Sequence, residues 1–229
     1  MQPPIQDASL PFQLADGTRV LLRPVACSDR EYFKLGFRSM SPESKYRRFF
    51  SSVPGLSDAM LRYFTEVDQI NHVAWVAVAA EKTPFAGLGV ARFVRMPEQP
   101  AIAEFSLTVI DAMQCKGLGR ALLSMLHLLA AERGVGILRA VCLLENQTVV
   151  SWLCRLGAES RGYAEGTVEL DLHVRKSLVL SAPSSSAAER FASTLDHLGQ
   201  ELRKHGGGGL PHSRSPVVPK RQRNTQLTN

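Results

Sequence analysis

The sequence lacks the features of a secreted, membrane-spanning or zinc-binding chain. No uninterrupted apolar stretch approaches the roughly 18 to 20 residues of a transmembrane helix. The first residues do not combine a basic segment with an apolar one, so no secretory signal is predicted. The four cysteines show neither Cys-x-x-Cys pairs nor zinc-type spacing, and we expect free thiols. The sequence therefore predicts a cytoplasmic protein that holds no metal and has no membrane partner.

Acidic residues are absent from the C-terminal end, and this places the basic character of the chain there. The whole sequence has 27 Lys and Arg against 21 Asp and Glu, which gives a formal net charge of +6. No acidic residue follows Glu201, whereas six basic residues do. The preceding part is therefore expected to be neutral, and no specific nucleic-acid partner is predicted from the charge.

The composition changes near residue 177, where Ser, Pro and Gly become frequent. Such sequence buries too little apolar surface to offset the entropy of ordering it. We therefore predict a domain at 14–176 and a flexible basic tail at 177–229. One stretch of the tail, 189–204, has helical spacing of apolar residues and is predicted as a short helix that docks on the domain or on a partner. These apolar residues are Phe191, Leu195, Leu198 and Leu202.

Strand and helix patterns interleave within the predicted domain. Strands are expected at 18–24, 72–80, 85–95, 101–109, 137–144 and 168–174. Helices are expected at 28–37, 43–51, from Ser57 onward, at 118–133 and at 147–156. The helix at 118–133 is predicted from an apolar stripe at helical spacing, formed by Leu118, Leu122, Met125 and Leu129. The short turn at 81–84 predicts a hairpin, and the later order predicts a β-α-β crossover. The fold class is therefore α+β, with a mixed, mostly antiparallel sheet flanked by helices.

A candidate anion-binding loop lies at 114–120, between a predicted strand and a predicted helix. Gly117 and Gly119 would let an anion approach the main chain, and Lys116 and Arg120 add positive charge. The unpaired amides and the dipole at a helix N-terminus attract the same kind of ligand. The pattern predicts a phosphate or pyrophosphate site, but glycines required only by a tight turn would give the same sequence.

Other phosphate-binding motifs fit this loop less well. A P-loop needs its lysine after the glycine, whereas Lys116 precedes Gly117 and no Ser or Thr follows in register. The dinucleotide fingerprint requires a third glycine where Leu122 stands, although Glu145 could act as the ribose-binding acid. Dinucleotide binding therefore stays open as a weaker alternative.

Several segments resemble a known family. The spacing Gln114-x-x-Gly117-x-Gly119 is similar to the acyl-CoA pyrophosphate motif of the GNAT N-acetyltransferase superfamily. So are Leu144-Glu145-Asn146, which open the next helix, and Leu156-Gly157, which close it. The segments that resemble the catalytic domain of bacterial Pat-type protein lysine acetyltransferases are Asp16-Gly17-Thr18, Ser41 to Phe50 and Ala103-Glu104-Phe105. Together they span residues 14–176 in order, and they imply a GNAT fold.

The resemblance also implies acetyl-CoA as co-substrate and assigns its contacts. Main-chain groups of Leu107, Thr108 and Val109 would pair with the pantetheine arm as if it were an added strand. Asn146 would contact the pantetheine region, and the loop would hold the pyrophosphate. The loop residues are Gln114, Cys115, Lys116, Gly117, Leu118, Gly119 and Arg120.

The acceptor amine needs a general base, since the pKa of a free lysine is about 10.4. On the strand at 101–109, Glu104 lies on the polar face, and its position matches the catalytic glutamate of the Pat-type enzymes. The position of Glu104 alone would equally suit a solvated carboxylate on an amphipathic strand. Leu153 stands where many GNAT enzymes have a tyrosine that protonates the leaving thiolate, so no acid is assigned. The run Tyr46-Arg47-Arg48 could line the acceptor groove or simply cover the surface of its helix.

The sequence thus predicts an N-acetyltransferase that moves an acetyl group from acetyl-CoA to a primary amine by direct attack in a ternary complex. A protein lysine is the preferred acceptor. A small-molecule amine acetyltransferase and a non-catalytic acyl-CoA-binding sensor remain alternatives. The oligomeric state is not predicted.

Overall fold

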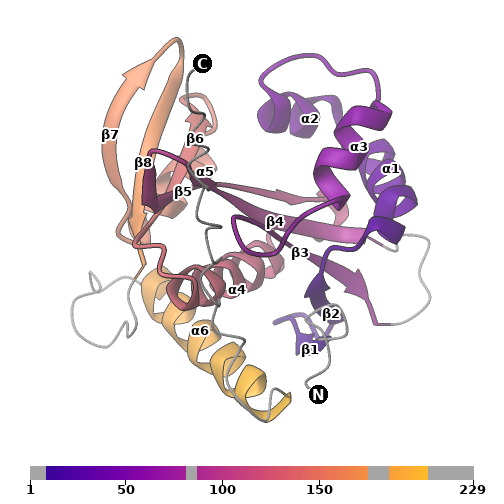
Figure 1. The fold of residues 1–229 in the computed structure, drawn as a ribbon, viewed down its shortest axis with the longest axis vertical. Helices are drawn as coiled ribbons and strands as arrows, with labels where there is room; N and C mark the ends of the chain where they lie inside the picture. The colour runs from indigo at the N-terminus through magenta and orange to yellow at the C-terminus, as the bar shows by residue number, and fades with distance from the viewer. Residues whose placement is uncertain (1–8, 81–86, 175–185, 206–229) are drawn as a thin grey trace, which may run out of the picture.

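The computed structural model describes residues 9–80, 87–174 and 186–205. Eight strands form one sheet in the order β1-β2-β3-β4-β5-β6-β8-β7 (Figure 1). The strands are β1 Leu10–Gln13, β2 Arg19–Pro24, β3 His72–Ala79, β4 Gly87–Met96, β5 Gln99–Val109, β6 Ile137–Leu143, β7 Glu159–Ala164 and β8 Thr167–His173. The helices are α1 Arg30–Ser39, α2 Pro42–Phe49, α3 Asp58–Thr65, α4 Leu118–Glu132, α5 Gln147–Arg155 and α6 Ser186–His205.

The sheet is mixed and mostly antiparallel, which confirms the predicted class. Its one parallel pair joins β5 and β6, and α4 makes the crossover between them. Strands β3 and β4 pair antiparallel, as the hairpin prediction requires. Strands β1 and β7 were not predicted. β1 is only four residues long, and β7 is an edge strand whose residues are largely exposed, so neither has a strong apolar pattern.

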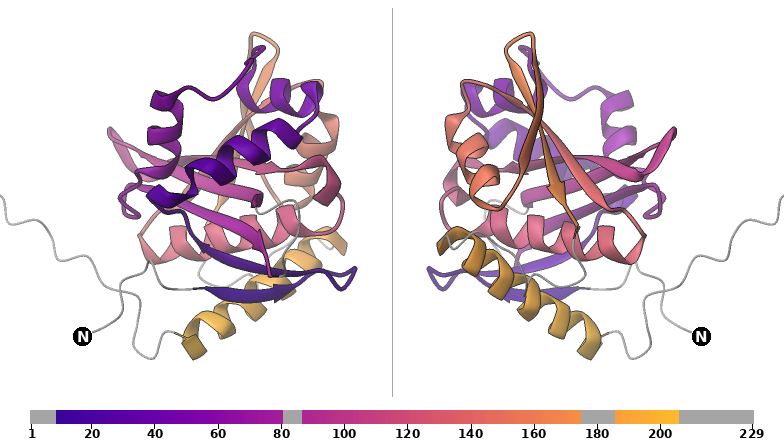
Figure 2. Two further views of the ribbon diagram at one scale, coloured as in Figure 1. Left: turned by 90° about the vertical axis from the view of Figure 1, so that its right-hand side faces the viewer. Right: turned by 90° about the vertical axis from the view of Figure 1, so that its left-hand side faces the viewer.

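Helices cover both faces of the sheet. Helix α4 packs against β3, β4 and β5 on one face, and α1 packs against β4 on the other, where α2 and α3 also lie (Figure 2). The apolar stripe predicted for α4 is fully buried, as its helical spacing requires. Its members are Leu118, Leu122, Met125 and Leu129.

The starts of α2 and α3 follow directly from the sequence. The hydroxyl of Ser41 accepts a hydrogen bond from the Ser44 amide at 3.1 Å, and Pro42 occupies the first helical position. The hydroxyl of Ser57 accepts one from the Met60 amide at 3.2 Å. Both serines therefore act as N-caps, which fixes where the chain enters the two helices.

The parallel pair of β5 and β6 is short. The strands are in register only from Ile102 to Glu104 on β5 and from Ile137 to Arg139 on β6. β5 continues to Val109, so its last five residues have no β6 partner in the described sheet. The edge of β5 is therefore open beside the start of α4.

Helix α6 is part of the folded body. It contains the helix predicted at 189–204 and packs against α4, with Phe191, Leu195 and Leu198 buried (Figure 2). This segment of the predicted flexible tail is thus ordered, because its apolar face finds a partner on the domain. The rest of that tail, 177–185 and 206–229, lies outside the described residues.

None of the helices in the described ranges is long and apolar enough to cross a membrane. In the same ranges, no group of three or more His, Cys, Asp or Glu side chains is arranged to hold a metal ion.

Candidate active site

The predicted anion-binding loop ends on an uncapped helix. Gly117, the N-cap of α4, has a φ of +90°, and Cys115 has a φ of +60°. The Ala121 amide donates to the Gly117 carbonyl at 3.1 Å, so the amides of 118–120 precede the helical hydrogen-bond ladder. Within the described chain no side chain caps this end of α4. Three amides and the helix dipole are therefore available to an anion.

Both cations of the loop are held in place by neighbours. The Lys116 ammonium lies 3.5 Å from a carboxylate oxygen of Asp16. The Nε of Arg120 donates to the Thr194 hydroxyl on α6 at 3.1 Å. The guanidinium of Arg120 lies against Gly117, since a Cβ at Gly117 would be 3.2 Å from its Nη2. Arg120 thus adds positive charge at the start of α4, and α6 contributes to positioning it.

The Gln114 side chain connects the loop to the end of β5 and to the start of α2. Its side-chain amide donates to the Val109 carbonyl at 3.2 Å and to the Ser44 hydroxyl at 3.3 Å. Asp111 completes the network by accepting from the Ser41 amide at 2.8 Å and from the Ser44 hydroxyl at 2.6 Å. The start of α2 is therefore tied to the loop. Sequence reasoning missed Asp111, because a single acidic residue in a turn has no distinctive pattern.

The open edge of β5 presents alternate main-chain groups. The Ile110 amide donates to the Leu88 carbonyl at 3.1 Å, in the register that pairs β5 with β4. Because hydrogen-bonded pairs alternate in an antiparallel ladder, the main chain of Thr108 also faces β4. The main-chain groups of Leu107 and Val109 face the open side. Of the three residues predicted to pair with pantetheine, Leu107 has both main-chain groups available and Val109 has its amide, because the Val109 carbonyl already accepts from Gln114. The main-chain groups of Thr108 are turned the other way.

Two glycines bring the start of α4 close to the strands. A Cβ on Gly89 of β4 would lie 2.9 Å from the Thr108 carbonyl oxygen and 3.0 Å from Leu122. A Cβ on Gly119 would lie 3.5 Å from the Leu107 side chain. Gly89 was not identified from the sequence, because its constraint comes from a register that only the folded sheet defines.

Glu104 lies on β5 at the point where β5 and β6 part. It is exposed, and its neighbours Ala103 and Phe105 are buried on the opposite face, as the alternation predicted. In the β5–β6 register it stands beside Arg139, which donates two hydrogen bonds to Asp171 at 2.7 and 2.9 Å. These hydrogen bonds, together with the charges of Asp171, Glu169 and then Glu104, raise the pKa of Arg139. A fixed cation therefore stands near the candidate base.

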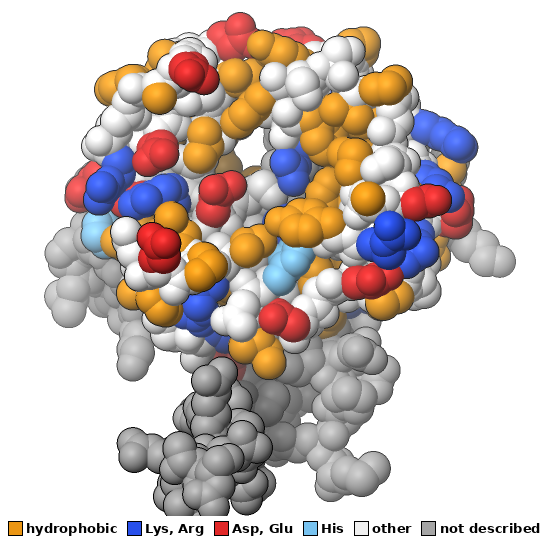
Figure 3. Space-filling model, turned by 45° about the horizontal axis from the view of Figure 1, so that its top comes forward, with side chains coloured by type: hydrophobic (Ala, Val, Ile, Leu, Met, Phe, Trp, Pro, Cys, Tyr) orange, Lys and Arg blue, Asp and Glu red, His pale blue; other side chains and the backbone are white. Residues whose placement is uncertain are grey.

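A cavity of about 430 Å³ opens in front of Glu104, between β4, β5, α2 and α3. Figure 3 shows this end of the molecule hollowed at its centre, with hydrophobic, acidic and basic side chains around the hollow. The polar side chains that line the cavity are Arg48, Tyr63, Arg92, Glu104 and Ser106. Most of the remaining lining is apolar or aromatic.

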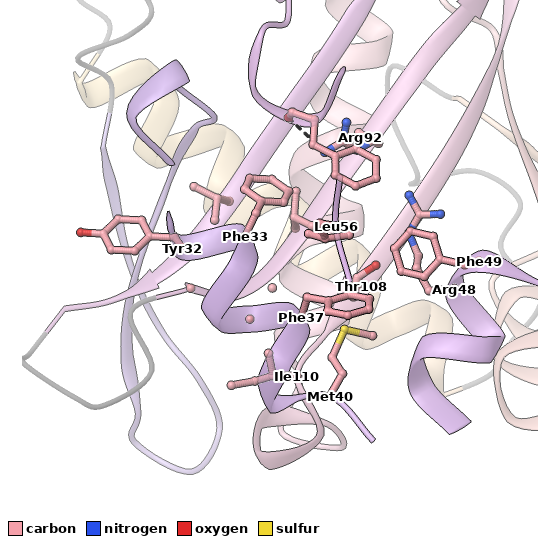
Figure 4. A pocket seen from close by; sticks show the side chains of 16 residues that line it. Tyr32, Phe33, Phe37, Met40, Arg48, Phe49, Leu56, Arg92, Thr108 and Ile110 are labelled. Atoms are coloured by element: carbon pink, nitrogen blue, oxygen red, sulfur yellow. Dashed lines mark hydrogen bonds between the residues drawn. The ribbon is translucent and has the colours of Figure 1, made fainter. Parts of the chain in front are cut away.

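A second, smaller cavity of about 70 Å³ adjoins the first and is mostly apolar. Phe33, Phe37 and Met40 line it, and so do Arg48 and Arg92 (Figure 4). These two arginines thus line both cavities.

The arginines have neutral partners. Arg92 is 4% exposed; it donates to the Phe64 carbonyl at 3.2 Å and lies 3.2 Å from the Nε2 of His72. Arg48 donates to the Ser106 hydroxyl at 3.1 Å. Burial, followed by the charge of Arg48, lowers the pKa of Arg92. Burial and the charge of Arg92 likewise lower the pKa of His72 to about 4, so this imidazole is neutral and accepts from the guanidinium.

The remaining predicted positions lie on α5. Asn146 is its N-cap and is half-buried; its carbonyl accepts from the Val149 and Val150 amides at 3.1 Å. Leu153 is 2% exposed and packs in the core, so this position supplies no acid.

No protein-family model matches the chain. The acetyltransferase Pat of Mycolicibacterium smegmatis is 36% identical over 149 residues, which are 65% of this chain and 44% of that relative. The chain thus spans less than half the length of this relative. The acetyltransferase PA5475 of Pseudomonas aeruginosa is 28% identical over 144 residues, which are 63% of this chain and 77% of that relative.

A solved structure supports the same grouping. The GNAT domain of S. lividans PAT superposes with a TM-score of 0.68 and is 28% identical, over 76% of this chain and 99% of that domain. The chain therefore has the GNAT fold, and its folded domain resembles the catalytic domain of the bacterial Pat-type acetyltransferases.

Proposed function

We propose that the protein is an N-acetyltransferase that transfers an acetyl group from acetyl-CoA to a primary amine, with a protein lysine as the acceptor. One observation carries the proposal. Glu104 lines a cavity and lies on β5, the same strand whose open edge leads to the uncapped start of α4. The relatives named as acetyltransferases support it. The protein is further proposed to act in the cytoplasm.

The donor site is proposed to run along β5 and onto α4. The main-chain groups of Leu107 and the amide of Val109 would hydrogen-bond to the pantetheine arm, as in strand addition. The amides of 118–120, with Lys116 and Arg120 beside them, would hold the pyrophosphate. The remaining loop residues Gln114, Cys115 and Gly117 would shape this turn, and Asn146 would contact the pantetheine region.

The reaction is proposed to be a direct attack. Glu104 takes the proton that the acceptor ammonium must lose, either directly or through a water molecule. The neutral nitrogen then attacks the thioester carbonyl carbon, and an outward-facing β5 amide stabilises the oxyanion. The carbon–sulfur bond breaks, sulfur keeps the electron pair, and the second nitrogen proton reaches sulfur through solvent. A thiol with a pKa near 8.5 needs no dedicated acid, which agrees with Leu153 at the tyrosine position.

The cavity favours a second candidate, the acetylation of a small-molecule amine. Its volume of about 430 Å³ is within the usual range of small-ligand sites. Incubation with labelled acetyl-CoA and a cell lysate, followed by mass spectrometry of acetylated lysines and of small amines, distinguishes the two acceptors.

The test of mechanism is the variant Glu104→Gln. We expect kcat to fall by roughly 10² to 10⁴, the usual contribution of a general base, while calorimetry gives an unchanged Kd for acetyl-CoA. Glu98→Gln is the matched control, because Glu98 is exposed in the β4–β5 turn at the far end of the same strand. An unchanged kcat in Glu104→Gln would remove Glu104 from the mechanism. Absence of any heat from acetyl-CoA would reject the proposal, and binding without turnover of any amine would favour a sensor.

A further inference from the structure

Two arginines of the candidate acceptor cavity have no acidic partner in the described ranges. Arg92 contacts the Phe64 carbonyl and the neutral imidazole of His72, and Arg48 contacts the Ser106 hydroxyl. Neither takes part in an ion pair within those ranges, whereas other inward-facing arginines of the same fold do. Their ion pairs are Arg23 with Asp29 and Arg139 with Asp171.

Glu104 is the one acidic side chain that lines this cavity in the described ranges, so the two arginines leave a net positive charge there. A buried cation without a counter-ion is costly, and the two guanidinium groups repel each other, as the lowered pKa of Arg92 indicates. The Phe64 ring lies 4.6 Å from the Arg92 guanidinium and offsets part of that cost. A neutral aromatic face does not remove the charge. The cavity is therefore suited to a compact anion.

The anion-binding groups lie at a defined place relative to Glu104. Ser106, which holds Arg48, is two residues farther along β5 on the same face, so its Cβ is about 7 Å from that of Glu104. The charge of Glu104 also acts on Arg48 and raises its pKa, although burial is the larger influence and lowers it. One ligand could therefore place a cationic amine at Glu104 and an anion at the arginines.

We propose that the acceptor carries a carboxylate close to its amine, and that Arg48 and Arg92 bind this carboxylate while the amine faces Glu104. The inference rests on the proposed acetyltransferase function and specifies its acceptor. A guanidinium suits a carboxylate because its parallel N–H groups match the two oxygens. The carboxylate has two sources, an acidic residue beside the acceptor lysine of a peptide or the acid group of a small amino acid.

Matched pairs of amines test the preference. One pair is γ-aminobutyrate and its amide, and the other is a capped Glu-Lys-Glu tripeptide and the corresponding Gln-Lys-Gln tripeptide. We expect the acidic member of at least one pair to have a kcat/KM about tenfold or more above its neutral partner, since a hydrogen bond to a charged group is worth roughly 1.5 to 3 kcal/mol. The pair that shows the preference identifies the source. Equal values within both pairs would overturn the inference but leave the acetyltransferase proposal intact.

Variants of the two arginines test whether the cavity causes the preference for acidic acceptors. Arg48→Gln should bring the acid-to-amide ratio close to one, and Arg48→Lys should restore part of it. The Kd for acetyl-CoA shows that each variant is folded. Arg47→Gln is the matched control on the same helix, because Arg47 pairs with Glu43 and does not line the cavity; it should keep the full preference. A preference that survives Arg48→Gln and also Arg92→Gln would refute the assignment.

A binding measurement covers the case in which none of these amines is turned over. Glutarate, a dicarboxylate without an amine, is titrated by NMR into the acetyl-CoA-loaded protein. We expect saturable shifts in resonances of β4 and β5 near Arg92 and Ser106, weakened about tenfold by Arg48→Gln and unchanged by Arg47→Gln. Absence of saturable binding to the loaded wild-type protein would overturn the inference, whereas failure of acetyl-CoA itself to bind would overturn the proposed function.

Discussion

The docking of α6 on α4 can be tested by truncating one buried aromatic side chain, in the variant Phe191→Ala. Phe191 is 3% exposed, and its ring meets the His127 ring edge-to-face at a centroid distance of 5.8 Å. Leu195 and Leu198 are buried along the same side of α6. The variant removes the first residue of this apolar stripe and leaves the exposed face of the helix unchanged.

The expected loss of stability is large relative to the total. Truncation of a buried phenylalanine costs about 3 to 5 kcal/mol, against a typical unfolding free energy of about 5 to 15 kcal/mol. For a chain of this length the melting temperature should fall on the order of 10 °C. The loss also reaches the candidate active site, since Thr194 on the same helix accepts from Arg120 at 3.1 Å. We therefore expect acetyl-CoA to bind several-fold more weakly to the variant.

Urea denaturation, hydrogen exchange of α6 and calorimetry with acetyl-CoA measure these effects in the full chain. Ser193→Ala is the matched control, because Ser193 lies on the exposed side of α6 two residues away. If Phe191→Ala lowered the denaturation midpoint no more than Ser193→Ala, α6 would not belong to the cooperative unit. If hydrogen exchange showed a loosened α6 and the Kd for acetyl-CoA did not change, the link through Arg120 would be refuted.

Two further predictions concern charges within the sheet. Asp171→Asn should lower the free energy of unfolding by roughly 3 kcal/mol, because it leaves the guanidinium of Arg139 without its bidentate partner. A loss below about 0.5 kcal/mol, measured by urea denaturation, would contradict this prediction. Burial and Arg92 lower the pKa of His72 from 6.5 to about 4, so between these values the unfolded chain binds more protons and stability should fall as the pH drops. His72→Gln should flatten that part of the profile of unfolding free energy against pH, and an unchanged slope would show that His72 does not cause it.

Much of the fold was predictable because its signals are local. The apolar residues of α4 recur at helical spacing, and all four predicted members of its stripe are buried. The caps Ser41 and Ser57 act through residues three positions away. The edge strand β7 was missed because its outer face is solvated and its sequence therefore carries little alternation.

The candidate site was predictable only in part, for a physical reason. The loop at 114–120 is one continuous segment, so its glycines and cations are visible together in the sequence. Arg92 and Gly89 are different, because their roles depend on contacts with distant parts of the chain. Arg92 is buried by the ring of Phe64, and Gly89 is constrained by the approach of Thr108. Such constraints arise from register and packing, and neither has a local pattern.

Strand β5 separates the two proposed substrates by using two different directions of the same backbone. Its open edge carries the main-chain groups proposed for the donor, and one of its faces carries the side chain of Glu104 and the cavity proposed for the acceptor. In a strand these directions are perpendicular, because hydrogen bonds lie in the plane of the sheet and side chains project from it. A side-chain substitution on that face therefore leaves the main-chain donor contacts in place. For this reason, acetyl-CoA affinity and acceptor preference can be measured as independent quantities in Glu104 and Arg48 variants.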